Sequence, residues 1–276
     1  MLLKPVTPRG LLLDLLRVTD AKAVPVSVLV QIGNVFGLTG NALRVAIARL
    51  VAAKLVESDE RGFYRLAKGA DALAVHVEEW RLGERRVRPW QGEWLALCLP
   101  QATERVRRRA SLRALGHMGF REALTSFWVR PDNLATRTHA ETLFALGLEN
   151  GAEAFVVREL STELESRLRT RTWNTRELVN GYREMRQKLE QSERSIAARS
   201  AELALRESFQ LGGSAIRLLA TDPLLPEEIV PSVERARLTA AMLRYDAVGR
   251  KVWAQALEGI RLQAAPSHST HAEVFA

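Results

Sequence analysis

The sequence predicts an α+β protein with several domains. Residues 36–66 have the pattern of an amphipathic helix followed by a short hairpin, and residues 94–158 alternate between strands and helices. From residue 161 onward the pattern is helical. A chain of 276 residues is long enough for two or three small domains.

Two helices are expected in the first 35 residues. A leucine-rich helix runs from about Pro8 to Val18, and a second begins near Pro25, whose missing N–H suits the first turn of a helix. We expect Gly33 and Asn34 to end the second helix with positive φ.

A third helix is predicted from Thr39 to Ala52. The Thr39 hydroxyl can accept a hydrogen bond from a free N–H of the first turn. At about 100° per residue, one stripe of the helix is apolar: Leu43, Ala46, Ile47 and Leu50. The outward face carries an amide, small side chains and two arginines: Asn41, Arg44, Val45, Ala48 and Arg49. Amides and guanidinium groups suit the base edges of the DNA major groove.

A hairpin follows this helix. Lys54–Ser58 and Phe63–Leu66 are expected as strands, with Asp59–Gly62 as the turn. Helix, turn, helix and hairpin in this order are typical of a winged helix-turn-helix, which places one helix in the groove and the hairpin on the backbone. The alternative is a helical hairpin that only packs on other helices, because such patterns have many false positives.

The middle of the chain begins after Pro89, Trp90 and Gly92. Three strands (Trp94–Leu99, Leu124–Val129, Ala152–Arg158) alternate with two helices (Thr103–Leu115, Asp132–Leu146), and Asp132 or Asn133 is the expected cap of the second helix. This alternation predicts a ferredoxin-like α/β sandwich.

An all-helical domain is predicted next. One helix opens at Asn174 or Thr175 and runs to about Gln191, others cover about 196–211 and 232–260, and Asp222–Pro226 is a rigid loop. Gly212–Ser214 is expected to be a helix-breaking turn. The resulting division is a winged helix at 1–70, a linker helix at 71–90, the middle domain at 91–160, the helical domain at 161–262 and a disordered tail at 263–276.

The net charge of +8 and the pI of about 10.2 favour a polyanionic partner. Arg105, Arg109 and Arg113 lie four residues apart and form one stripe of the middle domain's first helix. Arginine suits multivalent phosphate, as in coenzyme A or a DNA backbone. The alternative is a solvated face or a dimer contact.

Enzyme and membrane classes have no support in the sequence. It contains no GxSxG, Walker-type or dinucleotide glycine motif, and the five histidines have no metal-ligand spacing. We therefore expect no catalytic residue, no metal and no cofactor. No stretch approaches the roughly 18 apolar residues of a membrane span, so we expect a cytoplasmic protein.

Several blocks along the chain carry a resemblance. They are Pro8-Arg9, Phe36-Gly37, Leu43-Arg44, Arg49-Leu50, Phe63–Leu66, Pro89-Trp90, Phe127–Val129 with Pro131–Leu134, Trp173-Asn174 and Asp222–Pro226. In this order they resemble the PaaX family of bacterial transcriptional regulators.

The resemblance implies a homodimer that binds a palindromic operator on double-stranded DNA and represses a phenylacetate-type catabolic operon. It also implies phenylacetyl-coenzyme A, or a related acyl-coenzyme A, as the effector that releases DNA. Arg44 and Arg49 are then the recognition-helix arginines. The hairpin departs from the family pattern, because Glu57, Asp59 and Glu60 should repel phosphate and leave Arg61 and Arg65 as its contacts. A metabolite-binding or scaffolding protein with weak DNA affinity is the alternative function.

Overall fold

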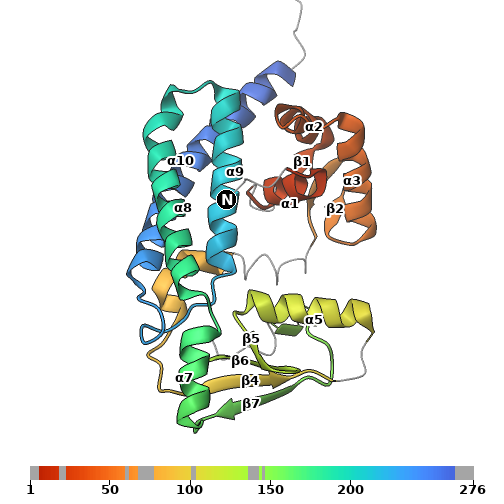
Figure 1. Cartoon of the computed structure of the whole chain (residues 1–276). Coiled ribbons are helices and arrows are strands. Elements are labelled where there is room, and N and C mark those ends of the chain that lie inside the picture. The colour runs from red at the N-terminus through yellow and green to blue at the C-terminus, as the bar shows by residue number, and fades with distance from the viewer. Residues whose placement is uncertain are drawn as a thin grey trace, which may run out of the picture. The chain divides into compact units, whose positions relative to one another are not determined.

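The chain has an α+β fold with two antiparallel sheets (Figure 1). The computed structural model describes residues 6–18, 23–59, 62–67, 78–100, 104–135, 143–144 and 147–264. It divides into two compact units, which are described separately. Unit 1 takes its described residues from 1–67, 196–210 and 247–276, and unit 2 takes its described residues from 68–195 and 211–246.

Unit 1 begins with three helices and a three-stranded sheet. The helices are α1 (Pro8–Val18), α2 (Val26–Val35) and α3 (Gly40–Ala52), and the strands are β1 (Val24–Pro25), β2 (Val56–Ser58) and β3 (Phe63–Leu66). The strand order is β1-β3-β2. The three helices and the hairpin confirm the predicted elements. The two-residue strand β1, where Val24 pairs with Tyr64, was not predicted.

The end of α2 differs from the prediction. Gly33 does not end the helix, which continues to Val35, and the left-handed position falls at Gly37, with φ of 73°. Gly33 is buried inside α2, where an added Cβ would lie 2.1 Å from Leu43 Cδ1. The glycine therefore permits the close packing of α2 on α3.

The core of unit 1 draws on residues far apart in the sequence. Leucines of α1 pack with α2 and α3, and Leu205 of α9 (Ala201–Ala220) and Trp253 of α10 (Val233–Ala264) complete the same cluster. The Phe36 and Phe209 rings meet edge to face at 5.0 Å, and Phe209 lies 5.9 Å from Trp253. The Arg206 Nε donates to the Val35 carbonyl at the end of α2.

Unit 2 contains a four-stranded sheet of order β5-β6-β4-β7. Its strands are β4 (Trp94–Cys98), β5 (Arg121–Leu124), β6 (Phe127–Pro131) and β7 (Glu153–Val157), and α5 (Arg105–His117) connects β4 to β5. The predicted single strand at Leu124–Val129 is wrong. Two strands meet there at a turn, in which Ser126 has a φ of 64° and donates its N–H to Glu122 Oε1 at 2.9 Å.

Alternate residues of β4 face the two sides of this sheet. Leu97 packs with Leu115 of α5 on one face, and Figure 1 shows α5 running along that side of the sheet. Ala96 packs with Leu168 of α7 (Thr162–Arg171) on the other. Trp94 and Trp173 stack on this second face with ring centroids 6.1 Å apart.

The helix predicted from Asp132 does not begin there. The Asp132 N–H donates to the Glu93 carbonyl, and Leu134 forms a bridge with Val87, so these residues extend the strand layer and neither Asp132 nor Asn133 is a cap. Residues 143–144 are helical, and 136–142 lie outside the described residues.

Helices form the rest of unit 2. The 3-10 segment η1 (Glu79–Arg86) is kinked at Gly83, with φ of 54°, and α8 (Thr175–Ser195) is capped as predicted by Asn174, which accepts from the Glu177 N–H at 3.1 Å. A second 3-10 turn, η2 (Ile196–Ala198), precedes α9 in unit 1. The predicted turn at Gly212–Ser214 is wrong, because α9 continues through it. An added Cβ on Gly212 would lie 3.7 Å from Met242 of α10, in ordinary contact.

Two predicted segments fall partly outside the described residues: 71–77 of the linker helix and 265–276 of the tail. Within the described ranges, no helix combines the length and apolar character needed to cross a membrane.

Candidate nucleic-acid interface

The helix α3 has one buried and one exposed face, as its sequence predicts. Leu43, Ile47 and Leu50 are buried against the core of unit 1. The opposite face exposes the five predicted contact residues Asn41, Arg44, Val45, Ala48 and Arg49. Val45 is 44% exposed, which is high for an apolar side chain within a helix. The helix therefore presents a small, polar and cationic surface to solvent.

Both ends of α3 are fixed by local hydrogen bonds. The Thr39 hydroxyl accepts from the Ala42 N–H at 3.2 Å, which confirms the predicted cap. At the other end, Lys54 takes a left-handed φ of 56°, and the Leu55 N–H donates to the Leu50 carbonyl at 3.0 Å. The exposed side chains thus stand on a helix whose limits are set by its own sequence.

The two arginines of α3 keep their hydrogen-bonding capacity. Among the described residues, neither Arg44 nor Arg49 forms an ion pair. A planar guanidinium that is not occupied by a carboxylate can bind guanine O6 and N7, or a phosphate, through two N–H groups.

The hairpin carries its own neutralising ion pair. Glu57 on β2 lies opposite Arg65 on β3, and the Arg65 Nε and Nη2 both lie 3.1 Å from Glu57 Oε2. Asp59 closes the turn by accepting from the Phe63 N–H at 2.9 Å. Arg61 lies outside the described residues. A phosphate must therefore compete with Glu57 for Arg65.

The helix α5 carries five arginines and no acidic residue. Arg105, Arg109 and Arg113, the predicted stripe, are all exposed. Elsewhere, arginines pair with an acid one turn away on their own helix, as in Arg169–Glu165 (2.6 Å), Arg206–Glu202 (3.1 Å) and Arg237–Glu234 (2.8 Å). Like charges four residues apart destabilise a helix, so α5 departs from the charge pattern of the other helices.

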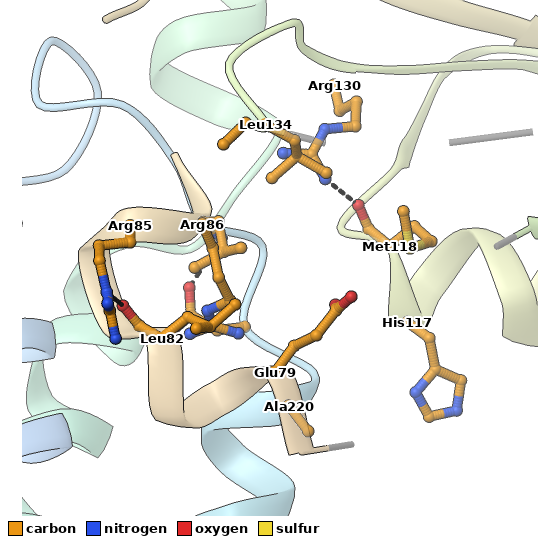
Figure 2. A pocket seen from close by; sticks show the side chains of 12 residues that line it. Glu79, Leu82, Arg85, Arg86, His117, Met118, Arg130, Leu134 and Ala220 are labelled. Atoms are coloured by element: carbon orange, nitrogen blue, oxygen red, sulfur yellow. Dashed lines mark hydrogen bonds between the residues drawn. The ribbon is translucent and has the colours of Figure 1, made fainter. Parts of the chain in front are cut away.

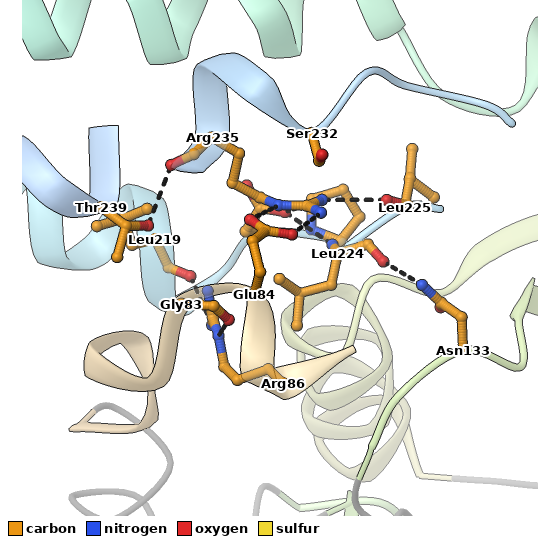
Figure 3. A network of polar contacts seen from close by, with 12 residues as sticks. Gly83, Glu84, Arg86, Asn133, Leu219, Leu224, Leu225, Ser232, Arg235 and Thr239 are labelled. Atoms are coloured by element: carbon orange, nitrogen blue, oxygen red, sulfur yellow. Dashed lines mark hydrogen bonds and ion pairs between the residues drawn. The ribbon is translucent and has the colours of Figure 1, made fainter. Parts of the chain in front are cut away.

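A buried polar network joins η1 to the loop Asp222–Pro226 (Figure 3). Arg235 of α10 is 2% exposed and donates to both carboxylate oxygens of Glu84, at 2.9 and 2.7 Å, and to the Leu225 carbonyl at 3.1 Å. Asp222 Oδ1 lies 3.7 Å from Arg235 Nη1 and accepts from the Leu224 N–H at 2.7 Å. Burial raises the pKa of Asp222, against the opposing effect of Arg235.

The same loop is held from the sheet side by Arg130 and Asn133. Arg130 donates to the Met118 carbonyl and, at 3.3 Å, to the Pro223 carbonyl, and Asn133 Nδ2 donates to the Leu224 carbonyl at 2.7 Å. Burial lowers the pKa of Arg130 to about 9. Because these acceptors are backbone carbonyls, the role of Arg130 is to position the loop.

Sequence reasoning identified the loop Asp222–Pro226 but missed its partners. Arg235 and Glu84 are 151 residues apart, and nothing in either local pattern points to the other. The signal available was indirect: an arginine within the apolar stripe of α10 requires a buried partner.

In the described part of the chain, no group of three or more histidine, cysteine, aspartate or glutamate side chains could hold a metal ion. Of the histidines, only His117 falls within the described residues.

Comparisons with known proteins find a family model that matches part of the chain. Residues 173–245, which include α8, α9 and the loop Asp222–Pro226, match the family model described as PaaX-like protein C-terminal domain. The solved structure of the uncharacterized protein Rv0674 from Mycobacterium tuberculosis is similar to this chain, with a TM-score of 0.59 and 22% identity, over 92% of this chain and 99% of that one. At that identity the similarity shows the fold. No curated protein matches the chain. Over residues 173–245, the chain is therefore similar to the C-terminal domain of PaaX-like proteins.

Proposed function

We propose that this protein is a DNA-binding transcriptional regulator whose helix α3 reads the major groove. The observation that carries the proposal is the exposed face of α3, with Asn41, Arg44 and Arg49 on a helix capped at Thr39 and packed on α2. The hairpin β2–β3 beside it supports a winged helix-turn-helix. The strand order β5-β6-β4-β7 supports a ferredoxin-like middle domain.

Each exposed side chain of α3 has a matching base edge. Arg44 and Arg49 pair with guanine, Asn41 pairs with adenine, and Val45 contacts a thymine methyl group, while Ala48 lets the helix approach the groove floor. Each bidentate pair contributes about 1–3 kcal/mol of discrimination against the wrong base. Thr39 lies at the helix start, and Arg61 and Arg65 are the proposed phosphate contacts of the hairpin.

The finer function follows the resemblance. The regulator acts as a homodimer on a palindromic operator and represses an aromatic-acid catabolic operon of the phenylacetate type. An acyl-coenzyme A effector, phenylacetyl-coenzyme A or a relative, favours a dimer geometry whose two α3 helices no longer match the half-site spacing. The phosphates of this effector bind Arg105, Arg109 and Arg113, whose charges no acid on α5 balances.

A gel shift with the DNA upstream of the protein's own gene tests the proposal. We expect a sequence-specific shift that Arg44→Ala abolishes and that phenylacetyl-coenzyme A, but not free coenzyme A, reverses. Arg237→Ala is the matched control, because Arg237 is also exposed but its Nη1 lies 2.8 Å from Glu234 on α10. The absence of any sequence-specific shift at low and high salt would refute the regulator.

The second candidate is a metabolite-binding or scaffolding protein with weak DNA affinity. The Glu57–Arg65 pair favours it, because it neutralises the hairpin cation that would otherwise meet phosphate. In that case DNA binding is equal for specific and random duplexes, and Arg44→Ala weakens both equally.

A further inference from the structure

Unit 2 contains a cavity of about 290 Å³ between η1, the end of α5 and the segment that follows α9. Figure 2 shows Leu82 and Arg86 on the side of η1 and His117 and Met118 on the side of α5, with Glu79 reaching between them. Leu134, Ala135, Ala220 and Leu224 contribute further apolar wall. A volume near 300 Å³ is at the lower end of small-molecule sites, so the cavity suits a compact ligand.

One lining residue, Arg86, is buried with part of its hydrogen-bonding capacity unused. The side chain is 8% exposed. Its Nε donates to the Gly83 carbonyl at 3.2 Å and its Nη1 to the Leu219 carbonyl at 3.1 Å. Nη2 is buried and has no hydrogen-bond partner among the described residues. A buried N–H without an acceptor is costly. Other buried nitrogens of the described chain also lack a partner, among them Trp80 Nε1 and Arg186 Nε, but of these residues Arg86 is the one that lines the cavity.

Little of the negative charge around Arg86 is fully buried. Three arginines, at 86, 130 and 235, are buried in this region. Of the nearby acids, the Asp222 side chain is fully buried, the Glu84 side chain is 35% exposed and Glu79 is half-buried. Arg235 takes both oxygens of Glu84, and Asp222 lies beside Arg235 as well. Burial lowers the pKa of Arg86 and of Arg130, so nearby acids do not offset the loss of solvent around either cation.

Four other titratable side chains at the cavity are already engaged. Glu79 and His117 each have an interaction of their own. Arg130 donates all its described bonds to carbonyl and amide oxygens that hold the loop. Arg85 is exposed and its Nε donates to the Leu82 carbonyl at 3.4 Å. Asp222 also lines the cavity, burial raises its pKa, and its Oδ2 has no hydrogen-bond partner among the described residues. The atoms with unmet hydrogen bonds are therefore Arg86 Nη2, which needs an acceptor, and Asp222 Oδ2, and both lie next to an apolar wall.

We propose that this cavity binds a small organic monocarboxylate with an apolar body. The carboxylate accepts a hydrogen bond from Arg86 Nη2, and the apolar body lies against Leu82, Met118 and Leu134. This site goes beyond the proposed function and does not depend on it, because every residue belongs to unit 2 and binding requires no DNA.

Isothermal calorimetry on the full chain without DNA tests the site. The probes are benzoate and hexanoate, each compared with its neutral amide, benzamide and hexanamide. We expect one carboxylate per chain, bound at least ten times more tightly than the matching amide, because the charged acceptor meets a buried guanidinium. The carboxylate should also raise the thermal midpoint as its concentration rises.

Two substitutions place the binding in the cavity. Ala135→Trp fills the exposed mouth and should weaken carboxylate binding at least tenfold, whereas Ala240→Trp, on an exposed position of α10, should leave it unchanged. Arg86→Met should abolish the preference for carboxylate over amide. If Arg86→Met does not fold, the wild-type comparison and the tryptophan pair still decide. Equal binding of acid and amide, no binding of either acid at 10 mM (roughly the weak-binding limit), or equal effects of the two tryptophans would overturn the proposal.

Discussion

Gly33 and Leu43 bring α2 and α3 into close contact: a Cβ on Gly33 would lie 2.1 Å from Leu43 Cδ1. Leu43 is fully buried and belongs to the same stripe that fixes which face of α3 is exposed. The position of the candidate recognition helix therefore depends on the absence of one methyl group.

Gly33→Ala should destabilise the protein by about 1–3 kcal/mol, the usual cost of overpacking a core, and this outweighs the helix propensity gained by alanine. Gly213→Ala is the matched control, because Gly213 is also helical but an added Cβ meets nothing within 4 Å. The control should be neutral or stabilising by up to about 1 kcal/mol. Urea unfolding measures both, and an equal change in the two variants would contradict the packing argument.

The salt dependence of DNA affinity should show whether Arg44 and Arg49 contact bases or phosphates. If each reads a base, its replacement by alanine costs about 1–3 kcal/mol on the specific site and relaxes the sequence preference at one position. A phosphate contact would instead weaken all duplexes alike and lower the slope of log affinity against log salt by about 0.9. Fluorescence anisotropy from low to high salt, on specific and random duplexes, separates the two outcomes.

Glu57→Gln should strengthen DNA binding. The substitution removes a carboxylate from the hairpin and releases Arg65 from its ion pair, which adds about one phosphate contact and steepens the salt slope by roughly 0.9. Glu159→Gln is the control for net charge, because it also removes one negative charge, at an exposed position of unit 2. Unchanged affinity in Glu57→Gln, or an equal gain in both, would show that the hairpin does not meet the backbone.

Arg235→Met should destabilise the protein by about 3–5 kcal/mol, because it leaves Asp222 buried without its countercharge. Arg237→Met, two residues away on α10, removes a 60% exposed arginine and should cost under about 1 kcal/mol. Asp222 already has a raised pKa, and loss of Arg235 raises it further. A raised acid pKa gives stability at low pH that is lost as pH increases, so the deficit of Arg235→Met should shrink toward acid. Urea unfolding at several pH values measures it, and a deficit that grows toward acid would refute this assignment.

Arg105/Arg109/Arg113→Ala should keep the fold and lose the response to acyl-coenzyme A. The substitution removes like charges at i,i+4, so the thermal midpoint should stay or rise slightly. The readout is the effector concentration that releases half the bound DNA. If the variant folds and keeps the wild-type response, these arginines do not bind the effector and form a solvated face or a dimer contact.

Local chemistry explains which elements the sequence could predict. The cap at Thr39, the buried stripe of α3 and the cap of α8 at Asn174 each depend on neighbours within a few residues. By contrast, β5 contains Arg121, Glu122 and Ala123, which are poor or neutral strand formers, and its hydrogen bonds to β6 outweigh their propensity.

The rest depends on contacts between distant residues. The strand β1 has two residues and no pattern to detect. The sequence pattern predicts a helix end at Gly33, because the tight contact of Gly33 with Leu43 cannot be recognised from sequence. The unpaired Nη2 of Arg86 likewise cannot be predicted from local sequence, because it depends on the Gly83 and Leu219 carbonyls, which accept from Nε and Nη1. The candidate DNA contacts could therefore be predicted from neighbouring residues in the sequence, whereas the cavity for a small ligand could not.

The core of unit 1 also sets when the protein can fold during its synthesis. Leu205 and Trp253 belong to the cluster formed by α1, α2 and α3, and a ribosome makes roughly 5–20 residues per second. The first 67 residues therefore emerge about ten seconds or more before the last part of their core exists. During that interval the nascent chain exposes the apolar surface that Trp253 later covers, and a shortened chain that ends before α10 would keep it exposed permanently.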